Sequence, residues 1–170
     1  MIYPIRLKQL AKIGLVFSVI LLWGCNESSD DKIEATYSSL WDNVFNSCAV
    51  GCHLPTATNG TEDGPDLSTK TLFYANTVNK TIGTDYPSWI RTGDCDSVNL
   101  IKQPGSTNES LIAGSLIQSV ADSISANFQN SNGQSCTNAF GVHETLNVTL
   151  SDQSTINALS AWINDGAPEK

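Results

Sequence analysis

The chain has 170 residues and carries 17 Asp and Glu against 9 Lys and Arg, a formal net charge of −8. This length suits one domain with a modest core once a leader segment is set aside. The strongly acidic composition argues against nucleic acid as a partner and favours a partner protein with a basic patch.

The first 24 residues predict a bacterial lipoprotein signal peptide. Three basic residues precede an apolar run from Ile13 to Trp23, which is too short to span a bilayer as a helix, since that needs about 20 residues. The sequence Leu22-Trp-Gly-Cys25 then resembles a lipobox, so Cys25 is the predicted lipidation site. The alternative is an uncleaved membrane anchor, and both interpretations place the rest of the chain outside the cytoplasm.

Residues 25–35 are polar and aperiodic, and they predict a short tether between the lipid and a domain over residues 36–170. Acyl chains on Cys25 would anchor the protein to the membrane. Asn26 after the cysteine favours the outer membrane of the bacterial envelope, facing the periplasm or the exterior. From Cys25 onward, six basic residues face all seventeen acidic ones, a formal charge of −11.

Apolar residues in steps of three and four predict an amphipathic helix at the start of the domain. They are Ile33, Tyr37, Leu40, Trp41, Val44, Phe45 and Cys48. Gly51 and Pro55 predict a turn after this helix, and residues 56–65 predict a loop. Ser68 or Thr69 is expected to cap a short helix that ends near Val78.

The second half of the chain predicts two further helices separated by loops. Ser106 and Glu109 fit a capping box in front of a helix over residues 111–120. Residues 121–145 are rich in Asn and Ser and predict mostly loop. Ser151 is expected to cap a last helix ended by Gly166 and Pro168; its apolar face is Ile156, Leu159, Trp162 and Ile163. The predicted fold class is therefore mainly α, with long loops.

The motif Cys48-x3-Cys52-His53 follows the first predicted helix and points to covalent haem attachment. Such attachment needs two thiols on one face for the haem vinyls and a histidine directly after the second as iron ligand. The usual spacing is C-x-x-C-H, and this chain has one extra residue. Positions i and i+4 share a helical face as i and i+3 do, and Gly51 allows the backbone to adjust.

Ordered sequence blocks between Tyr37 and Pro168 resemble the c-type cytochrome domains first noted in planctomycetes. They are Leu40–Cys48, Cys52–Pro55, Gly64–Ser68, Tyr74–Val78, Pro104–Ile112, Leu150–Asp152 and Ala161–Pro168. The resemblance implies a cytochrome c-like fold whose N- and C-terminal helices pack across each other beside haem c. It also implies that Cys48 and Cys52 form the thioethers and that His53 is the proximal iron ligand, with Pro55 near it.

The resemblance leaves the sixth iron ligand open. The family commonly supplies a Met before the C-terminal helix, but the one Met of this chain is Met1. His143 lies at about the expected place, so the hypothesis is an iron held by His53 and His143, low-spin and of lower potential than a Met/His centre. The alternative is that His143 is an exposed loop residue and that water, or nothing, takes the sixth position.

Four cysteines remain after Cys25, so disulfides are expected in an oxidising compartment. If haem takes Cys48 and Cys52, then Cys95 and Cys136 are left to pair, and this bridge would hold the His143 loop near the site. Pairing of Cys48 or Cys52 with either of the other two would exclude haem attachment.

The leading function is that of a membrane-anchored monohaem cytochrome c that carries electrons and is not an enzyme, although haem peroxidase activity stays open. The pocket walls would be aromatic side chains, which alternatively form an ordinary core: Trp41, Phe45, Phe73, Trp89 and Trp162. The second hypothesis is a haem-free surface lipoprotein stapled by two disulfides on the same scaffold. The third is a zinc site of Cys48, Cys52, His53 and one of Cys95, Cys136 or His143.

Overall fold

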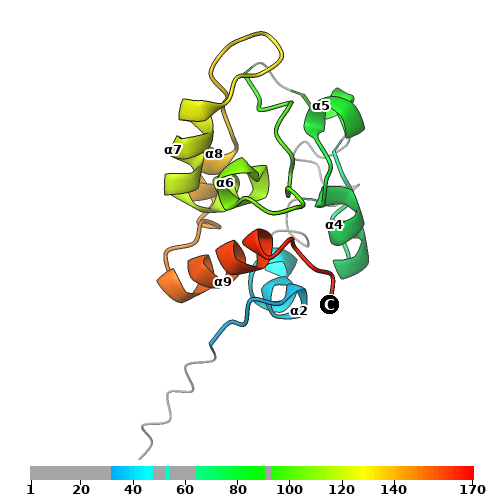
Figure 1. The fold of residues 1–170 in the computed structure, drawn as a ribbon, viewed down its shortest axis with the longest axis vertical. Helices are drawn as coiled ribbons and strands as arrows, with labels where there is room; N and C mark the ends of the chain where they lie inside the picture. Colours follow the sequence, from blue (N-terminus) through cyan, green and yellow to red (C-terminus); the bar gives the residue numbers. More distant parts are fainter. Residues whose placement is uncertain (1–31, 48–52, 54–63, 91–92) are drawn as a thin grey trace, which may run out of the picture. The chain divides into compact units, whose positions relative to one another are not determined.

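The computed structural model describes residues 32–47, 53, 64–90 and 93–170 (Figure 1). The chain divides into two compact units, Met1–Lys32 and Ile33–Lys170, and every element below belongs to the second. The predicted signal peptide, the lipidation site Cys25 and the predicted thioether sites Cys48 and Cys52 lie outside the described residues, as does the predicted turn at Gly51 and Pro55. Within the described part, no helix is long and apolar enough to traverse a bilayer.

The described part of the chain is mainly helical, which confirms the predicted fold class. Its first half contains α2 (Tyr37–Leu40), the π-helical turn η2 (Trp41–Phe45), α4 (Lys70–Thr77), α5 (Ile82–Asp85) and the 3-10 turn η3 (Pro87–Trp89). Its second half contains the 3-10 turn η4 (Thr107–Glu109), α6 (Leu111–Leu116), α7 (Gln118–Asn127), α8 (Phe140–Thr145) and α9 (Gln153–Asn164). β-Structure among these residues is limited to isolated bridges, such as Val78 with Ile101 and Asp94 with Thr137.

The first predicted helix exists but begins at Tyr37 rather than Ile33. Thr36 has an extended backbone, and its hydroxyl accepts a hydrogen bond from the Ser39 amide, so it caps the helix. The predicted stripe faces inward, because its side chains from Tyr37 onward are buried up to Phe45. The spacing therefore identified the buried face, while the cap decided the start.

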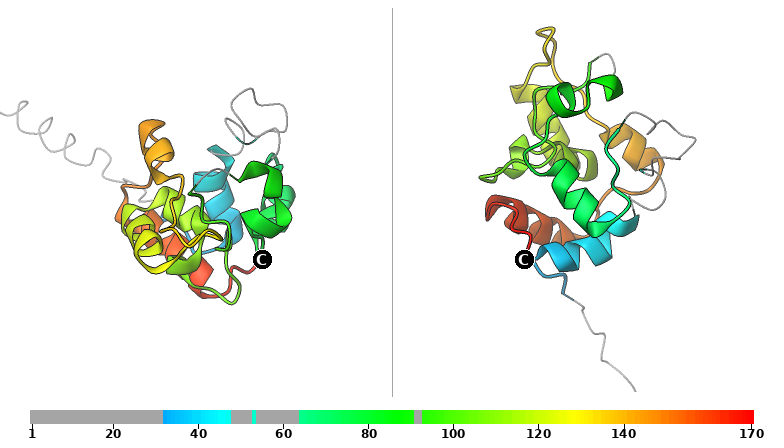
Figure 2. Two further views of the ribbon diagram at one scale, coloured as in Figure 1. Left: turned by 90° about the horizontal axis from the view of Figure 1, so that it is seen from above. Right: turned by 90° about the vertical axis from the view of Figure 1, so that its right-hand side faces the viewer.

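α9 packs against α2, so the first and last helices of the domain are in contact (Figures 1 and 2). Tyr37 and Trp162 stack with ring centroids 5.5 Å apart and an interplanar angle of 16°. Phe45 joins them, at 5.8 Å from Trp162 and 4.4 Å from Phe73. Rings buried in this way contribute both apolar area and favourable ring contacts, and this aromatic cluster forms the centre of the core.

The predicted cap of α9 is wrong by one residue. Asp152, not Ser151, is the N-cap, and its carboxylate accepts hydrogen bonds from the Thr155 amide at 2.8 Å and the Ser154 hydroxyl at 2.6 Å. A carboxylate at this position also complements the positive end of the helix dipole. The predicted end is confirmed, since Gly166 has φ +88°, the left-handed conformation that favours glycine after a helix.

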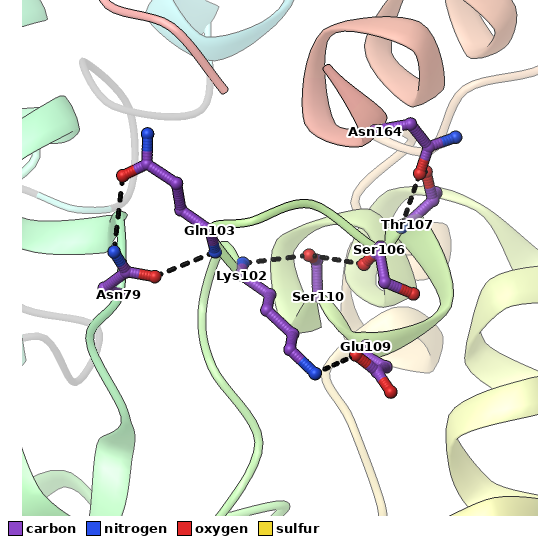
Figure 3. Close-up of polar contacts among 8 residues, drawn as sticks. All are labelled: Asn79, Lys102, Gln103, Ser106, Thr107, Glu109, Ser110 and Asn164. Carbon is purple, nitrogen blue, oxygen red and sulfur yellow. Dashed lines mark hydrogen bonds and ion pairs between the residues drawn. The ribbon is translucent and has the colours of Figure 1, made fainter. Parts of the chain in front are cut away.

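The predicted capping box at Ser106 and Glu109 is also wrong. The 3-10 turn η4 intervenes before α6, and the Ser106 side chain makes no capping hydrogen bond. Instead the Ser106 carbonyl accepts from the Ser110 hydroxyl at 2.9 Å, and Glu109 pairs with Lys102 (Figure 3). The Glu109 amide donates to the Ser106 carbonyl at 3.0 Å, so the S-x-x-E segment forms the η4 turn and does not cap α6.

The same turn docks on the end of α9. The Thr107 amide and hydroxyl both donate to the Asn164 side-chain oxygen, at 3.1 and 3.0 Å (Figure 3). Gly105 lies so close that a Cβ there would be 1.5 Å from the Ile163 carbonyl oxygen. Only glycine allows this approach of two backbones, so residues 105–107 form a fixed joint between α9 and the segment leading to α6.

The prediction of mostly loop over residues 121–145 is wrong in part. α7 extends to Asn127 and buries Val120, Ala121 and Ile124, while α8 adds a further short helix. The many Ser and Asn residues of this region lower helix propensity, yet packing of the three apolar residues of α7 overrides it. Residues 128–139 are non-helical, as predicted.

Candidate functional site

The structure brings together His53 and His143, which are 90 positions apart in the sequence. Their ring centroids are 6.3 Å apart and the ring planes meet at 73°. His143 lies on α8, which packs on α6, rather than in the predicted loop. His53 is tied to the start of the next described segment, because its carbonyl accepts the Leu67 amide at 3.3 Å.

His143 is fixed by a helix end. Its Nδ1 lies 3.0 Å from the carbonyl oxygen of Ser115, in the last turn of α6. Carbonyls there have no partner within their own helix, and a carbonyl can only accept, so Nδ1 carries the proton. This leaves the Nε2 lone pair free, which is the arrangement of most metal-binding histidines: one ring nitrogen donates to a carbonyl and the other coordinates.

His53 has a ring nitrogen without a partner. Its Nδ1 is buried and makes no hydrogen bond within the described part of the chain. A buried polar atom left in this state costs about 1–3 kcal/mol, so such an atom needs an explanation. Burial lowers the pKa of His53 below its ordinary value, and the neighbouring His143 lowers it further. His53 is therefore neutral at pH 7, which is the form that coordinates a metal.

Trp89 also packs against His53. Its ring centroid lies 5.9 Å from that of His53, with the planes at 87°. Gly64 makes room for it, since a Cβ at residue 64 would be 2.9 Å from Cε2 of the indole. The sequence predicted Trp89 as a wall of the site but gave no role to Gly64, whose function depends on a close approach between distant segments.

The separation of the two histidines fits a single metal ion between them. A metal–nitrogen bond of about 2.0 Å, with about 1.1 Å from each nitrogen to its ring centre, places opposed imidazole centroids about 6.2 Å apart. Ordinary aromatic ring pairs also span about 4.5–7 Å, so the distance alone does not distinguish a metal site from ring packing. The partnerless Nδ1 of His53 and the fixed tautomer of His143 are the observations that favour a metal ion. No group of three or more His, Cys, Asp and Glu side chains that could hold a metal ion occurs among the described residues.

Four of the five aromatic residues predicted around the site pack elsewhere. Trp41, Phe45, Phe73 and Trp162 are buried in the core, where Trp41 contacts Phe73 edge-on at 5.8 Å. Their alternative interpretation as ordinary core is the one that the described contacts support, and Trp89 is the one of the five in contact with His53.

Cys95 and Cys136 are buried neighbours on adjacent segments. The Cys95 amide and thiol both donate to the Thr137 carbonyl, at 3.2 and 2.9 Å, which brings Cys95 beside the residue that follows Cys136, and both thiols are free. Burial raises the pKa of both thiols. A disulfide between them stays a prediction.

The comparisons with known proteins gave no match: no family model, no curated protein and no solved structure is significantly similar to the chain.

Proposed function

We propose that this protein is a membrane-anchored, monohaem c-type cytochrome that carries electrons and is not an enzyme. Cys48 and Cys52 would hold haem c through thioethers, His53 and His143 would bind its iron, and Cys25 would carry the lipid anchor in the bacterial envelope. When bound, haem c supplies a one-electron couple at its iron. Cys95 and Cys136 would form a disulfide that braces the scaffold.

The meeting of His53 and His143 is the observation that supports this proposal most. His53 directly follows Cys52, as the attachment chemistry needs. His143 is the only other histidine of the chain, and the fold places its ring 6.3 Å from that of His53. If His143 were only an exposed loop residue, neither its closeness to His53 nor its hydrogen bond to the end of α6 would be expected.

The residues of the chain would tune the site as well as hold it. The Ser115 carbonyl accepts the Nδ1 proton of His143, which makes Nε2 a stronger donor and stabilises the more positive iron state. Trp89 contacts His53 edge-on, with ring centroids 5.9 Å apart, and would help to keep water away from it. Two imidazole ligands together favour a lower potential than a Met/His pair.

A second candidate is the haem-free lipoprotein stapled by two disulfides. The close packing of the aromatic cluster favours it, because these rings fill the core by contacting one another and need no cofactor to do so. They are Tyr37, Phe45, Phe73 and Trp162. In that case Cys48 and Cys52 would form the second disulfide, and the histidine pair would be structural.

The experiment is to express the full chain with its signal peptide in a host that has cytochrome maturation genes. We expect a membrane-bound protein with a haem mass increment and a Soret band that survives denaturation. The double variant C48A/C52A is the matched control, and it should lose the haem mass increment and the Soret band. A colourless wild-type protein that lacks four hydrogens, as two disulfides require, would establish the second candidate instead.

A further inference from the structure

The geometry of the histidine pair would suit a bare metal ion as well as a haem iron. The ring centroids of His53 and His143 lie 6.3 Å apart. Two imidazoles that bind one ion from opposite sides, through bonds of about 2.0 Å, have centroids about 6.2 Å apart. Both ring planes then contain the line through the two bonds, and each ring can be turned about that line by any angle. The observed angle of 73° between the planes is therefore compatible with such a complex.

Each ring offers a nitrogen lone pair. The Nδ1 of His143 donates to the Ser115 carbonyl at 3.0 Å, which leaves the lone pair on Nε2. The Nδ1 of His53 is buried and has no hydrogen-bond partner within the described part of the chain. Burial lowers the pKa of His53, as does the neighbouring His143, so the His53 ring is neutral at pH 7. A neutral imidazole is the form that binds a metal ion.

The number and type of these donors favour monovalent copper. A structural zinc site needs four ligands, whereas the described residues contain no group of three or more His, Cys, Asp and Glu side chains that could hold an ion. Imidazole is a good copper ligand, and carboxylates are better suited to magnesium, calcium and manganese. Cu(I) has a filled d shell and binds two ligands in a line, which is the arrangement that two opposed rings provide.

The contacts that hold the two rings in place do not involve a cofactor. The His53 carbonyl accepts the Leu67 amide at 3.3 Å, and α8, which carries His143, packs on α6. The aromatic core beneath is closed by its own ring contacts, such as that of Tyr37 with Trp162 at 5.5 Å. A chain without haem would therefore keep the two histidines together.

We propose that the haem-free chain binds one Cu(I) ion between the Nε2 of His143 and the Nδ1 of His53. This inference goes beyond the proposed function and does not rest on it. Both would use the same two rings, so copper and haem iron would exclude each other at this site.

The test uses the full chain carrying C48A/C52A, which cannot attach haem and lacks the two thiols that precede His53 in the sequence. Cu(I) is supplied without oxygen as its bicinchoninate complex, whose loss of colour reports transfer to the protein. We expect one Cu(I) per chain. H53A and H143A, each added to this background, should weaken binding at least about a hundredfold, since loss of an outer-shell partner alone costs about 10–100-fold.

Two further variants separate ligation from structure. H143Q has an amide that can still donate to the Ser115 carbonyl, yet it should lose copper as H143A does. Glu144→Gln is the matched control, because Glu144 is exposed and follows His143 on α8; its affinity should stay within about twofold, since a carboxylate is a poor ligand for Cu(I). Urea unfolding midpoints show which variants remain folded, and C48S/C52S replaces C48A/C52A as background if the latter does not fold.

Nuclear magnetic resonance identifies the ligands directly. The chain has two histidines, and Cu(I) is diamagnetic, so the ring signals of both stay visible during the titration. Both sets of signals should move when copper is added to the C48A/C52A chain. In the H143A variant the His53 signals should stay where they are.

The outcomes separate this inference from the proposed function. Copper that remains bound in H53A or H143A, or that moves neither set of histidine signals, would overturn the inference and place the ion elsewhere, such as at Cys95 and Cys136. Displacement of Cu(I) by an equal concentration of Zn(II) would overturn it as well. Haem attachment is measured on the wild type and copper binding on C48A/C52A, so either proposal can fail while the other stands.

Discussion

Replacing Gly105 by alanine would separate the η4 turn from the end of α9. The new Cβ would lie 1.5 Å from the Ile163 carbonyl oxygen and 2.5 Å from its carbon. Non-bonded heavy atoms need about 3.5 Å, so the two backbones would have to move apart by about 2 Å. Since both obstructing atoms belong to the main chain, no side-chain rotation can relieve the clash.

The cost of this separation follows from the contacts at the joint. The two hydrogen bonds from Thr107 to Asn164 would be lost, at about 1 kcal/mol each, and overpacking would add about 1–3 kcal/mol. We therefore expect Gly105→Ala to lower the free energy of unfolding by about 3–5 kcal/mol, a large share of the about 5–15 kcal/mol of a typical domain.

Urea unfolding followed by tryptophan fluorescence measures this change, because Trp162 is fully buried one residue before Ile163. Gly141→Ala is the matched control. Gly141 lies in α8 with open space around its Cβ position, so alanine there should be neutral or stabilising by up to about 1 kcal/mol. A Gly105→Ala midpoint equal to that of the wild type would refute the joint.

Three further predictions concern stability. Trp162→Phe should lower the free energy of unfolding by about 2–3 kcal/mol in the same urea assay, since it removes the hydrogen bond to the Pro168 carbonyl and part of a fully buried ring; a change below about 0.5 kcal/mol would contradict this. Hydrogen bonds from Ser154 and Thr155 hold the pKa of Asp152 well below its usual range, so its stabilisation is full above about pH 4 and is lost as the pH falls further. The melting temperature of the wild type should therefore fall more steeply below pH 4 than that of Asp152→Asn, whereas parallel curves would count against the cap. Finally, mapping of the exported protein should find Cys95 bonded to Cys136, and reduction should lower stability by about 4 kcal/mol; free thiols in that protein would rule out the bridge.

The sequence predicted buried faces better than helix ends. The stripe from Tyr37 to Phe45 and the apolar face of α9 were visible because spacing alone determines which side of a helix is apolar. The caps at Ser151 and Ser106 were wrong because several Ser, Thr and Asp residues adjoin each start, and backbone geometry selects among them. The part of α7 after Val120 was missed because its polar composition concealed the buried Ala121 and Ile124.

Only part of the candidate site could be predicted. His53 and His143 were identified from the chemistry of haem attachment and iron ligation. The short distance between their rings is an independent observation that favours the same hypothesis. The roles of Ser115 and Gly64 were not predictable. Ser115 acts through its main-chain carbonyl, and Gly64 acts because it has no Cβ that would collide with Trp89. Both contributions depend on which distant segments meet, and no local pattern encodes that.

The ferric visible and electron paramagnetic resonance spectra of the haem-loaded protein, with and without His143→Ala, test most directly whether both histidines bind one iron. The wild type should be low-spin, and the variant should turn high-spin while keeping its covalent haem. Identical spectra for the two proteins would remove His143 from the iron and contradict the account.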